Sequence, residues 1–154
     1  MYPPEDPDYH PMAAGRTLFM NRIGLAEARQ IVDTLDKATA SFRVTQIRVL
    51  GGAIARVPAE ATAYAHRSAP IMVNVAAFYT TPEDRVTQTR WVDDYMAALR
   101  QDDAGAYVNF IALEAPERIH AAYPKPTLER LRAIKKRYDP GNLFRLNQNI
   151  VPAE

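Results

Sequence analysis

The 154-residue chain is predicted to adopt an α+β fold: an antiparallel or mixed sheet of four to five strands, with helices on one face and an extended C-terminal tail. Two long segments carry apolar residues at helical spacing, and several short segments are rich in β-branched residues. Crossover helices between neighbouring strands are too few for a doubly wound parallel sheet. The expected order of elements is β-α-β-β-β-α-β-α-α.

The N-terminal half is predicted to form an arm, a strand, a helix and a second strand. The arm holds four prolines, which favour extended chain. The helix has apolar residues at 25, 28, 32 and 35, the spacing of one helical face. The second strand ends at Gly51-Gly52, which predicts a turn. In order, these elements cover residues 1–15, 16–23, about 25–38 and 42–50.

The C-terminal half is expected to begin with a short strand through Ile54 and Val57, followed by the clearest strand of the chain. That strand, residues 71–79, is apolar on both faces except at Asn74. A long helix follows, for which Thr81 can cap and Pro82 suits the first helical position. The later elements are the helix at about 82–100, a strand over 107–113, helices over 117–123 and 127–138, and extended chain with turns over 139–151.

Composition excludes several classes of function. The net charge of +1 gives no nucleic-acid surface and no basic face for a membrane. With no cysteine, the chain has no disulfide, thiolate metal site, cysteine nucleophile or cysteinyl bond to a flavin. His10 and His120 lack metal-ligand spacing, so no metal site is predicted. No apolar run approaches the ~20 residues that cross a bilayer, and the acidic, proline-rich N-terminus is unlike a signal peptide. The expected location is cytoplasmic.

The last third of the chain carries an ordered series of motifs. A helix with Arg130-Leu131 and Lys135 leads into a turn and an amide-rich tail. The sequence there reads Tyr138-Asp139-Pro140-Gly141-Asn142-Leu143-Phe144, then Asn147-Gln148-Asn149-Ile150. This run resembles the C-terminal signature of the berberine-bridge-like FAD-linked oxidoreductases. An Asp-Pro-x-Asn alone is ordinary turn chemistry, whereas the whole ordered run is specific.

Upstream segments resemble the same family in the same order. They are Gly51-Gly52-Ala53-Ile54, then Thr62-Ala63-Tyr64-Ala65-His66-Arg67, then Tyr107-Val108-Asn109-Phe110. Family members are about three times longer, and the resemblance implies that their first half is an FAD-binding domain with a Gly-rich pyrophosphate loop. No such loop occurs among the six glycines here.

The resemblance therefore implies three parts and a partner. Residues 1–15 form the arm or linker, 16–126 a partial substrate-type domain, and 127–154 the family's C-terminal helix and tail. FAD is expected in the complete assembly, with weak or no binding to this chain alone. The partners implied are an FAD-binding domain or partner chain and a small-molecule substrate. If the tail docks on such a domain, Leu143, Phe144 and Ile150 should be unusually exposed.

Three residues are candidates for the site. The resemblance places Tyr107 at the reactive face of the flavin as the catalytic residue, and Asn109 beside the cofactor. On the expected strand both would point to one face. A tyrosine serves as a base only beside a positive or hydrogen-bonding group; otherwise Tyr107 is a packed strand residue. Asn74 is a candidate for the substrate pocket, or else bonds to a loop at a sheet edge. The pair His66-Arg67 could bind an anion or orient a loop, and the resemblance favours a scaffold role.

Two functions remain open at this point. The first is an FAD-dependent oxidoreductase, or its substrate-side portion, that oxidises an alcohol or amine by hydride transfer to the flavin. The second is a non-catalytic remnant or binding module of α+β fold that holds no flavin by itself. The absent phosphate loop favours the second function for the isolated chain. The retained Tyr107 and Asn109 favour the first function for the complete assembly.

Overall fold

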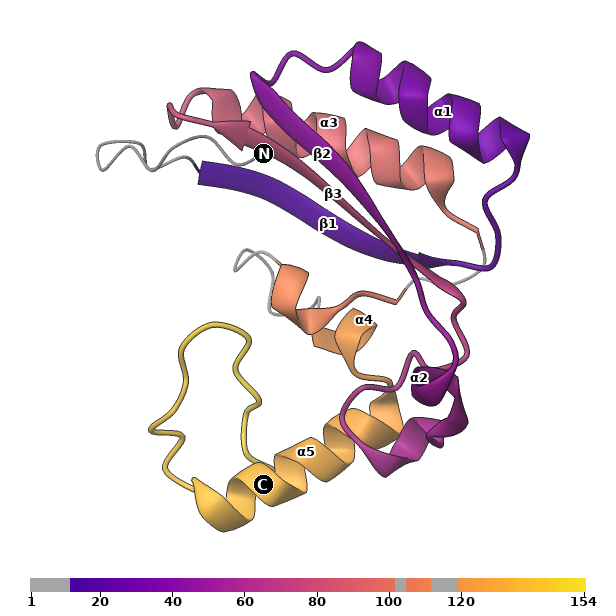
Figure 1. Ribbon diagram of the computed structural model, residues 1–154. Coiled ribbons are helices and arrows are strands. Elements are labelled where there is room, and N and C mark those ends of the chain that lie inside the picture. The colour runs from indigo at the N-terminus through magenta and orange to yellow at the C-terminus, as the bar shows by residue number, and fades with distance from the viewer. Residues whose placement is uncertain (1–11, 102–104, 112–118) are drawn as a thin grey trace.

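The structure is a computed structural model that describes residues 12–101, 105–111 and 119–154 (Figure 1). At its centre is a three-stranded antiparallel sheet with strand order β1-β3-β2. One face is covered by helices α1 (Leu25–Asp36) and α3 (Asp84–Leu99), and shorter elements and the C-terminal part lie below the other. The strands are β1 (Met12–Met20), β2 (Phe42–Val49) and β3 (Ile71–Tyr79). The elements below are α2 (Ala53–Arg56), η1 (Ala59–Ala61), η2 (Val108–Phe110), α4 (Ile119–Ala122) and α5 (Lys125–Tyr138).

The central strand β3 organises the sheet because it is apolar on both faces. Val73 and Val75 are completely buried, and they lie on the face that the helices cover. The register is continuous on both sides, with Val73 opposite Leu18 of β1 and Ile47 of β2. The predictions of an α+β fold, an antiparallel sheet and a strand over 71–79 are confirmed.

The helix-covered face holds the larger core. Tyr95 of α3 is 1% exposed; its hydroxyl donates to the carbonyl of Ile31 at 3.3 Å and shares a 2.9 Å hydrogen bond with the Thr45 hydroxyl. Burial raises the pKa of Tyr95, and the bond to Thr45 opposes this shift only in part. Trp91 meets the Tyr95 ring edge to face at 5.3 Å between centroids. Tyr95 and Trp91 are therefore core residues, and the predicted coverage of one face by two helices is correct.

Two of the expected strands are replaced by helical turns in the part of the chain that is described. Residues 53–56 form α2, which follows Gly51 and Gly52 with φ of 134° and 52°. These left-handed values favour glycine and turn the chain away from the sheet. Residues 108–110 form the 3-10 helix η2, while 112 and 113 lie outside the described residues. The expectation of four to five strands is therefore not confirmed, and the described sheet has three.

Several element boundaries differ from the sequence prediction. β1 begins at Met12 and not at Arg16, because its small residues pair with β3 as far as Tyr79. The helix expected from 82 begins at Asp84, since Thr81 and Pro82 instead accept turn hydrogen bonds from the amides of Asp84 and Arg85. Thr81 still donates its hydroxyl to the Asp84 carboxylate at 3.0 Å. Shifts of this size are normal at element ends.

The other face of the sheet carries a smaller, aromatic core. Phe19 of β1 is 1% exposed and packs with Met72 and Ala69. Its ring stacks on the His66 ring with 4.4 Å between centroids and meets Tyr64 at 6.4 Å. Leu50, Tyr107 and Phe110 pack against this cluster. This second layer, and not the helix-covered core, supports the residues predicted to form the site.

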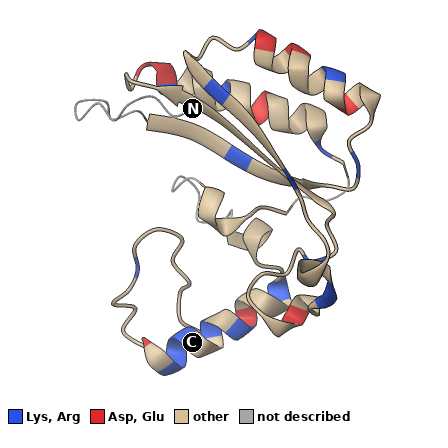
Figure 2. Cartoon of the chain, in the orientation of Figure 1, with Lys and Arg blue, Asp and Glu red and all other residues tan. Residues whose placement is uncertain are grey.

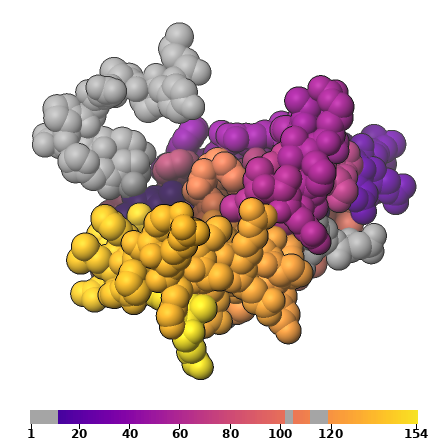
Figure 3. Space-filling model, turned by 90° about the horizontal axis from the view of Figure 1, so that it is seen from below, coloured from indigo at the N-terminus to yellow at the C-terminus, as the bar shows by residue number. Residues whose placement is uncertain are grey.

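The C-terminal helix α5 lies beside the segment around residues 50–67 (Figure 3). The Arg130 side chain joins the two by donating to the Glu60 carbonyl at 3.0 Å. Basic residues gather in the last turn of α5, where they suit the helix dipole (Figure 2). None of the helices in the described ranges combines the length and the apolar character that a membrane span requires.

The tail after α5 is an irregular loop, and the carboxylate of Asp139 holds its first part. Asp139 accepts the backbone N–H groups of Leu143 at 2.7 Å and Phe144 at 3.0 Å, and it pairs with Lys135. Lys135 also donates to the Phe144 carbonyl. We call these contacts the Asp139 clasp. Leu143 is 77% exposed and Phe144 78%, as predicted, whereas Ile150 is half-buried.

The clasp should open only in acid. Its bond to Lys135, and then the two backbone N–H bonds, lower the pKa of Asp139 below the ordinary value of 3.8. A depressed folded pKa means that the stabilisation is present above the unfolded value and is lost as pH falls through the folded one. NMR should show the Leu143 and Phe144 amide signals moving together with a midpoint below 3.8. Asp139→Asn should remove this titration. A midpoint at or above 3.8 in the unaltered chain would contradict the clasp.

Candidate functional site

A cavity of about 340 Å³ opens on the aromatic side of the sheet. Strands β2 and β3 contribute its floor, the segment after β2 contributes one wall, and the segment before η2 contributes another. We call it the Tyr107 cavity. Its lining residues are Arg48, Leu50, Ile54, Tyr64, Arg67, Met72 and Tyr107.

Tyr107 is fixed in this cavity by its backbone and its ring. Its N–H donates to the Thr17 hydroxyl of β1 at 2.9 Å, which ties the segment to the sheet through a side chain. Its ring meets Tyr64 edge to face at 6.0 Å and Phe110 at 5.5 Å. Burial raises the pKa of Tyr123, and the nearby Tyr107 adds to that shift. Tyr107 is half-buried, and its ring lies between the rings of Tyr64 and Phe110.

Asn109 and Tyr107 are brought together, although not in the predicted way. Asn109 Nδ2 donates to the Tyr107 phenolic oxygen at 2.9 Å. The expected strand geometry is wrong here because residue 107 is extended and 108–110 turn into η2. The turn folds the exposed amide back onto the phenol. The Asn109 amide is thus a hydrogen-bonding group beside the phenol, of the kind that a tyrosine base requires.

Asn74 lies in the same sheet but outside the Tyr107 cavity. It is 7% exposed in the middle of β3, with Thr17 and Gln46 as its neighbours across the sheet. Its Nδ2 reaches Gln46 Oε1 at 3.5 Å, a long hydrogen bond. Met72, two residues away on the same face, does line the cavity. The pocket role of Asn74 stays a prediction.

Two arginines of the cavity were not predicted as site residues. Arg48 places its guanidinium 5.2 Å from the centre of the Phe110 ring, and its Nη2 donates to Gln46 Oε1 at 3.3 Å.

Arg67 lies 5.3 Å over Tyr64 and donates to the Ile54 carbonyl and the Thr62 hydroxyl. The pair His66-Arg67 was noted in the sequence as able to bind an anion. The alternation of Gln46 and Arg48 on one face of β2 was the signal that could have found Arg48.

His66 serves the scaffold. Its ring stacks on Phe19 with 4.4 Å between centroids. Its Nε2 donates a hydrogen bond to the Ala122 carbonyl at 3.3 Å. These contacts join β1, the loop before β3 and α4. Among the described residues, no three His, Cys, Asp or Glu side chains are placed to hold a metal ion.

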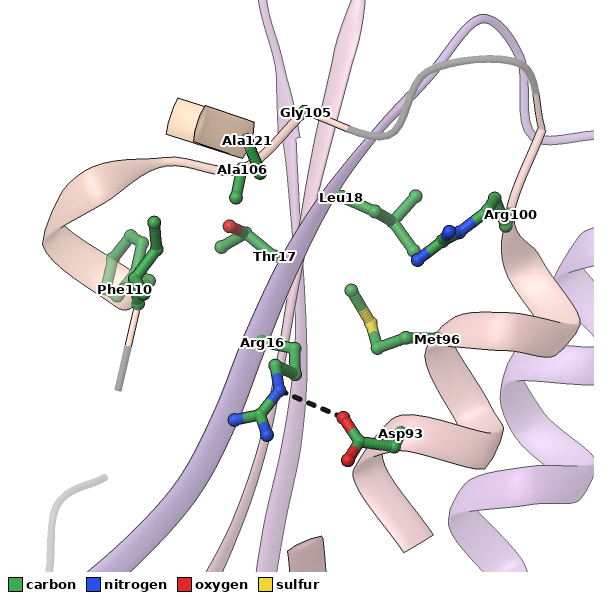
Figure 4. A pocket seen from close by; sticks show the side chains of 11 residues that line it. Arg16, Thr17, Leu18, Asp93, Met96, Arg100, Gly105, Ala106, Phe110 and Ala121 are labelled. Carbon is green, nitrogen blue, oxygen red and sulfur yellow. Dashed lines mark hydrogen bonds and ion pairs between the residues drawn. The ribbon is translucent and has the colours of Figure 1, made fainter. Parts of the chain in front are cut away.

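A second cavity, of about 290 Å³, lies at the edge of β1 (Figure 4). Arg16 points across it and pairs with Asp93 of α3 at 2.9 Å. Arg16 also donates to the Gly15 carbonyl at 2.9 Å, and its side chain is 11% exposed. Asp93 therefore meets the charge of Arg16, while Arg100 also lines this cavity. This cavity shares Thr17 with the segment that carries Tyr107, but it does not contain the phenol.

Comparison with known proteins decides the family. The family model described as "Berberine and berberine like" matches residues 106–151, a span that includes Tyr107, Asn109, α5 and the Asp139 clasp. The chain corresponds to the C-terminal portion of the berberine-bridge-like FAD-linked oxidoreductases. Homologues of this type imply FAD in the complete enzyme.

Individual relatives agree. An uncharacterized FAD-linked oxidoreductase of Bacillus subtilis, YgaK, is 34% identical over 105 residues, which cover 68% of this chain and 23% of that protein. A xylooligosaccharide oxidase of Thermothelomyces thermophilus is 31% identical over 134 residues, covering 80% and 27%. The solved structure of Physcomitrella patens BBE-like 1 superposes with a TM-score of 0.76 at 26% identity, covering 92% of this chain and 31% of that chain. The chain thus spans about a quarter of the length of these curated relatives.

Proposed function

We propose that this chain forms the substrate-side wall of an FAD-dependent oxidoreductase that oxidises an alcohol, or less favourably an amine, to the carbonyl or imine. The observation that carries the proposal is the bond from Asn109 Nδ2 to the Tyr107 phenol, at a cavity and inside the segment that the family model matches. FAD, when bound, supplies the two-electron chemistry by accepting the hydride.

The chain's own residues handle the proton. The substrate hydroxyl hydrogen-bonds to the Tyr107 phenolic oxygen, which as a phenolate takes the hydroxyl proton while the carbon–hydrogen bond breaks. Asn109 donates to this oxygen at 2.9 Å and fixes its position. Tyr64 and Phe110 hold the Tyr107 ring from two sides, so the oxygen is positioned before substrate arrives. An alcohol is favoured because its hydroxyl carries the proton that such a base removes.

The described residues fit the ring of a flavin better than its phosphates. Tyr107 and Asn109 present a phenol and an amide, groups suited to the polar wall beside a flavin ring. Gly51 and Gly52 form an open turn in which an added Cβ would meet nothing within 4 Å. That turn leads into a four-residue helix, however, and supplies no Gly-rich cradle for a pyrophosphate. The phosphate contacts belong to the FAD-binding domain that this proposal requires.

We therefore expect the isolated chain to bind FAD weakly or not at all. Titration followed by flavin fluorescence should give a Kd above about 1 μM, since most dinucleotide affinity comes from phosphate contacts. Co-expression with an FAD-binding domain of this family should yield a yellow complex. Submicromolar binding to the chain alone would contradict the division of roles.

The exposed tail offers a control for that assembly. Leu143 and Phe144 are held outward by the Asp139 clasp, so Leu143→Ser with Phe144→Ser should weaken co-purification of the FAD-binding domain. The matched control is Leu25→Ser on α1, which is 68% exposed but lies on the opposite side of the sheet. Equal loss in both variants would remove the tail from the interface.

The alternative is a binding module without catalysis, and the missing phosphate cradle favours it for the chain alone. The two functions separate in the same complex. If the complex binds FAD and anaerobic alcohol or sugar substrates reduce it, the catalytic function stands. A colourless complex, or a flavin that no substrate reduces, would leave the binding module.

A further inference from the structure

Among the described residues that line the Tyr107 cavity, two are positively charged and none is negatively charged. Arg48 and Arg67 are its only ionised lining residues, and neither forms an ion pair within the described ranges 12–101, 105–111 and 119–154. In the neighbouring cavity, by comparison, Arg16 pairs with Asp93 at 2.9 Å. Guanidinium groups gathered without a carboxylate raise the potential of the cavity and attract an anion.

Both guanidiniums are placed one aromatic ring away from the reactive phenol. Arg48 lies over Phe110, whose ring contacts Tyr107 at 5.5 Å. Arg67 lies over Tyr64, whose ring contacts Tyr107 at 6.0 Å. Arg48, Arg67 and the proposed base Tyr107 therefore line the same cavity. A bound molecule that meets the phenol lies within reach of a charge.

The two arginines differ in how many hydrogen bonds hold their side chains in place. Arg67 is fixed by the Ile54 carbonyl and the Thr62 hydroxyl, and its buried Nε finds no hydrogen-bond partner among the described residues. Arg48 is exposed, and its one hydrogen bond within the described chain is the 3.3 Å contact to Gln46. A planar guanidinium of this kind binds a carboxylate through two parallel hydrogen bonds. Arg48 is thus the group free to contact a ligand, and Arg67 strengthens the field.

We infer that the Tyr107 cavity binds an alcohol that also bears a carboxylate, such as a sugar acid. This inference rests on the proposed function and names the substrate class of the same site. The hydroxyl of the substrate meets Tyr107, and its carboxylate meets Arg48. The rings of Tyr64 and Tyr107 and the apolar Leu50, Ile54 and Met72 cover the carbon skeleton. The volume of about 340 Å³ suits a molecule of one sugar ring, at the small end of ligand cavities.

Binding to the chain itself is the first test, and it does not depend on flavin. The probes are D-glucuronate and D-glucose, which differ at one carbon by a carboxylate. The chain has five methionines, so methyl-labelled methionine gives few NMR signals, and Met72→Leu assigns the cavity signal. Glucuronate should shift the Met72 methyl signal with an affinity at least about tenfold above that of glucose, and added salt should weaken it.

Arg48→Gln should reduce glucuronate affinity at least about tenfold and leave glucose unchanged. Arg29→Gln is the matched control, because it removes the same charge from an exposed position on α1 and should change nothing. Equal affinity for both sugars, no glucuronate-dependent shift, or a normal response in Arg48→Gln would overturn the inference.

Kinetics in the flavin-loaded assembly separates the two proposals. Arg48→Gln should raise KM for the sugar acid and leave kcat nearly unchanged, because it removes binding and not proton transfer. Flavin reduction that depends on Tyr107 but shows no preference for the acid would leave the proposed function intact and overturn the carboxylate site. Absent reduction with every substrate, alongside selective glucuronate binding, would overturn the function alone.

Discussion

Replacing Tyr107 with Phe should slow anaerobic flavin reduction in the complete assembly by at least about 100-fold, the lower end of typical general-base contributions. The change removes the phenolic oxygen that accepts the Asn109 amide at 2.9 Å. It keeps the ring that packs on Tyr64 and Phe110, so folding and flavin content should be little affected. Stopped-flow measurement of single-turnover reduction is the test, since it isolates chemistry from product release.

The control for this prediction is Tyr138→Phe. Tyr138 ends α5 and is 73% exposed. Its substitution removes the same hydroxyl group from a residue outside the cavity. Its reduction rate should match that of the unaltered assembly. A rate within a few-fold of the parent for Tyr107→Phe would place the base elsewhere, in the FAD-binding domain or near Asn74.

Replacing Phe19 with Ala should destabilise the chain by about 3–5 kcal/mol, the range for deleting a fully buried aromatic ring. Phe19 is 1% exposed and holds His66 and Tyr64 on the far side of the sheet. Its loss leaves a space that β1 cannot close, because the strand is paired with β3 along its whole length. Urea unfolding followed by circular dichroism should show a lower midpoint with little change in slope.

Phe42→Ala is the control, because it makes the same substitution at a less buried position. Phe42 begins the edge strand β2, is 48% exposed and contacts Phe78 at 5.0 Å between centroids. Its removal should cost about 1 kcal/mol, because half of the ring is already in water. Similar losses at both positions would mean that Phe19 does not anchor the second layer. The cavity walls would then depend on other contacts.

Periodicity predicted much of the fold, and it failed where contacts between distant segments decide. Residues 71–79 were placed correctly because a nine-residue, almost wholly apolar run between turn signals is typical of a buried strand. Residues 107–110 also carry three large apolar or aromatic side chains, yet the Tyr107 N–H bonds to the Thr17 hydroxyl and the preceding Ala106 N–H bonds to the Ala121 carbonyl. No strand of the described sheet is placed to pair with them. A local pattern does not distinguish a strand from a 3-10 turn in that case.

The candidate site was predictable only in part for a related reason. The motif singled out Tyr107 and Asn109, whose side chains are hydrogen-bonded at a 3-10 turn and do not share a strand face as expected, and their roles stay a prediction. Arg48 lies 59 positions before Tyr107, and the two share a cavity because the segment with Tyr107 is bonded to Thr17 of β1, beside Met72 of β3 and Arg48 of β2. No spacing in the sequence reports that contact. The chemistry of a residue can be read from its type, but its neighbours come from the fold.

The Asp139 clasp lowers the entropy that the tail would lose on binding a partner. A free tail would lose backbone freedom on docking, at about 1–2 kcal/mol for each residue that becomes ordered. Here Leu143 and Phe144 are already set in place by Asp139 and Lys135 before any partner arrives. The ordering cost is met during folding, so more of the contact energy remains as affinity. The loop that carries Leu143 and Phe144 is therefore preorganised for the docking proposed above.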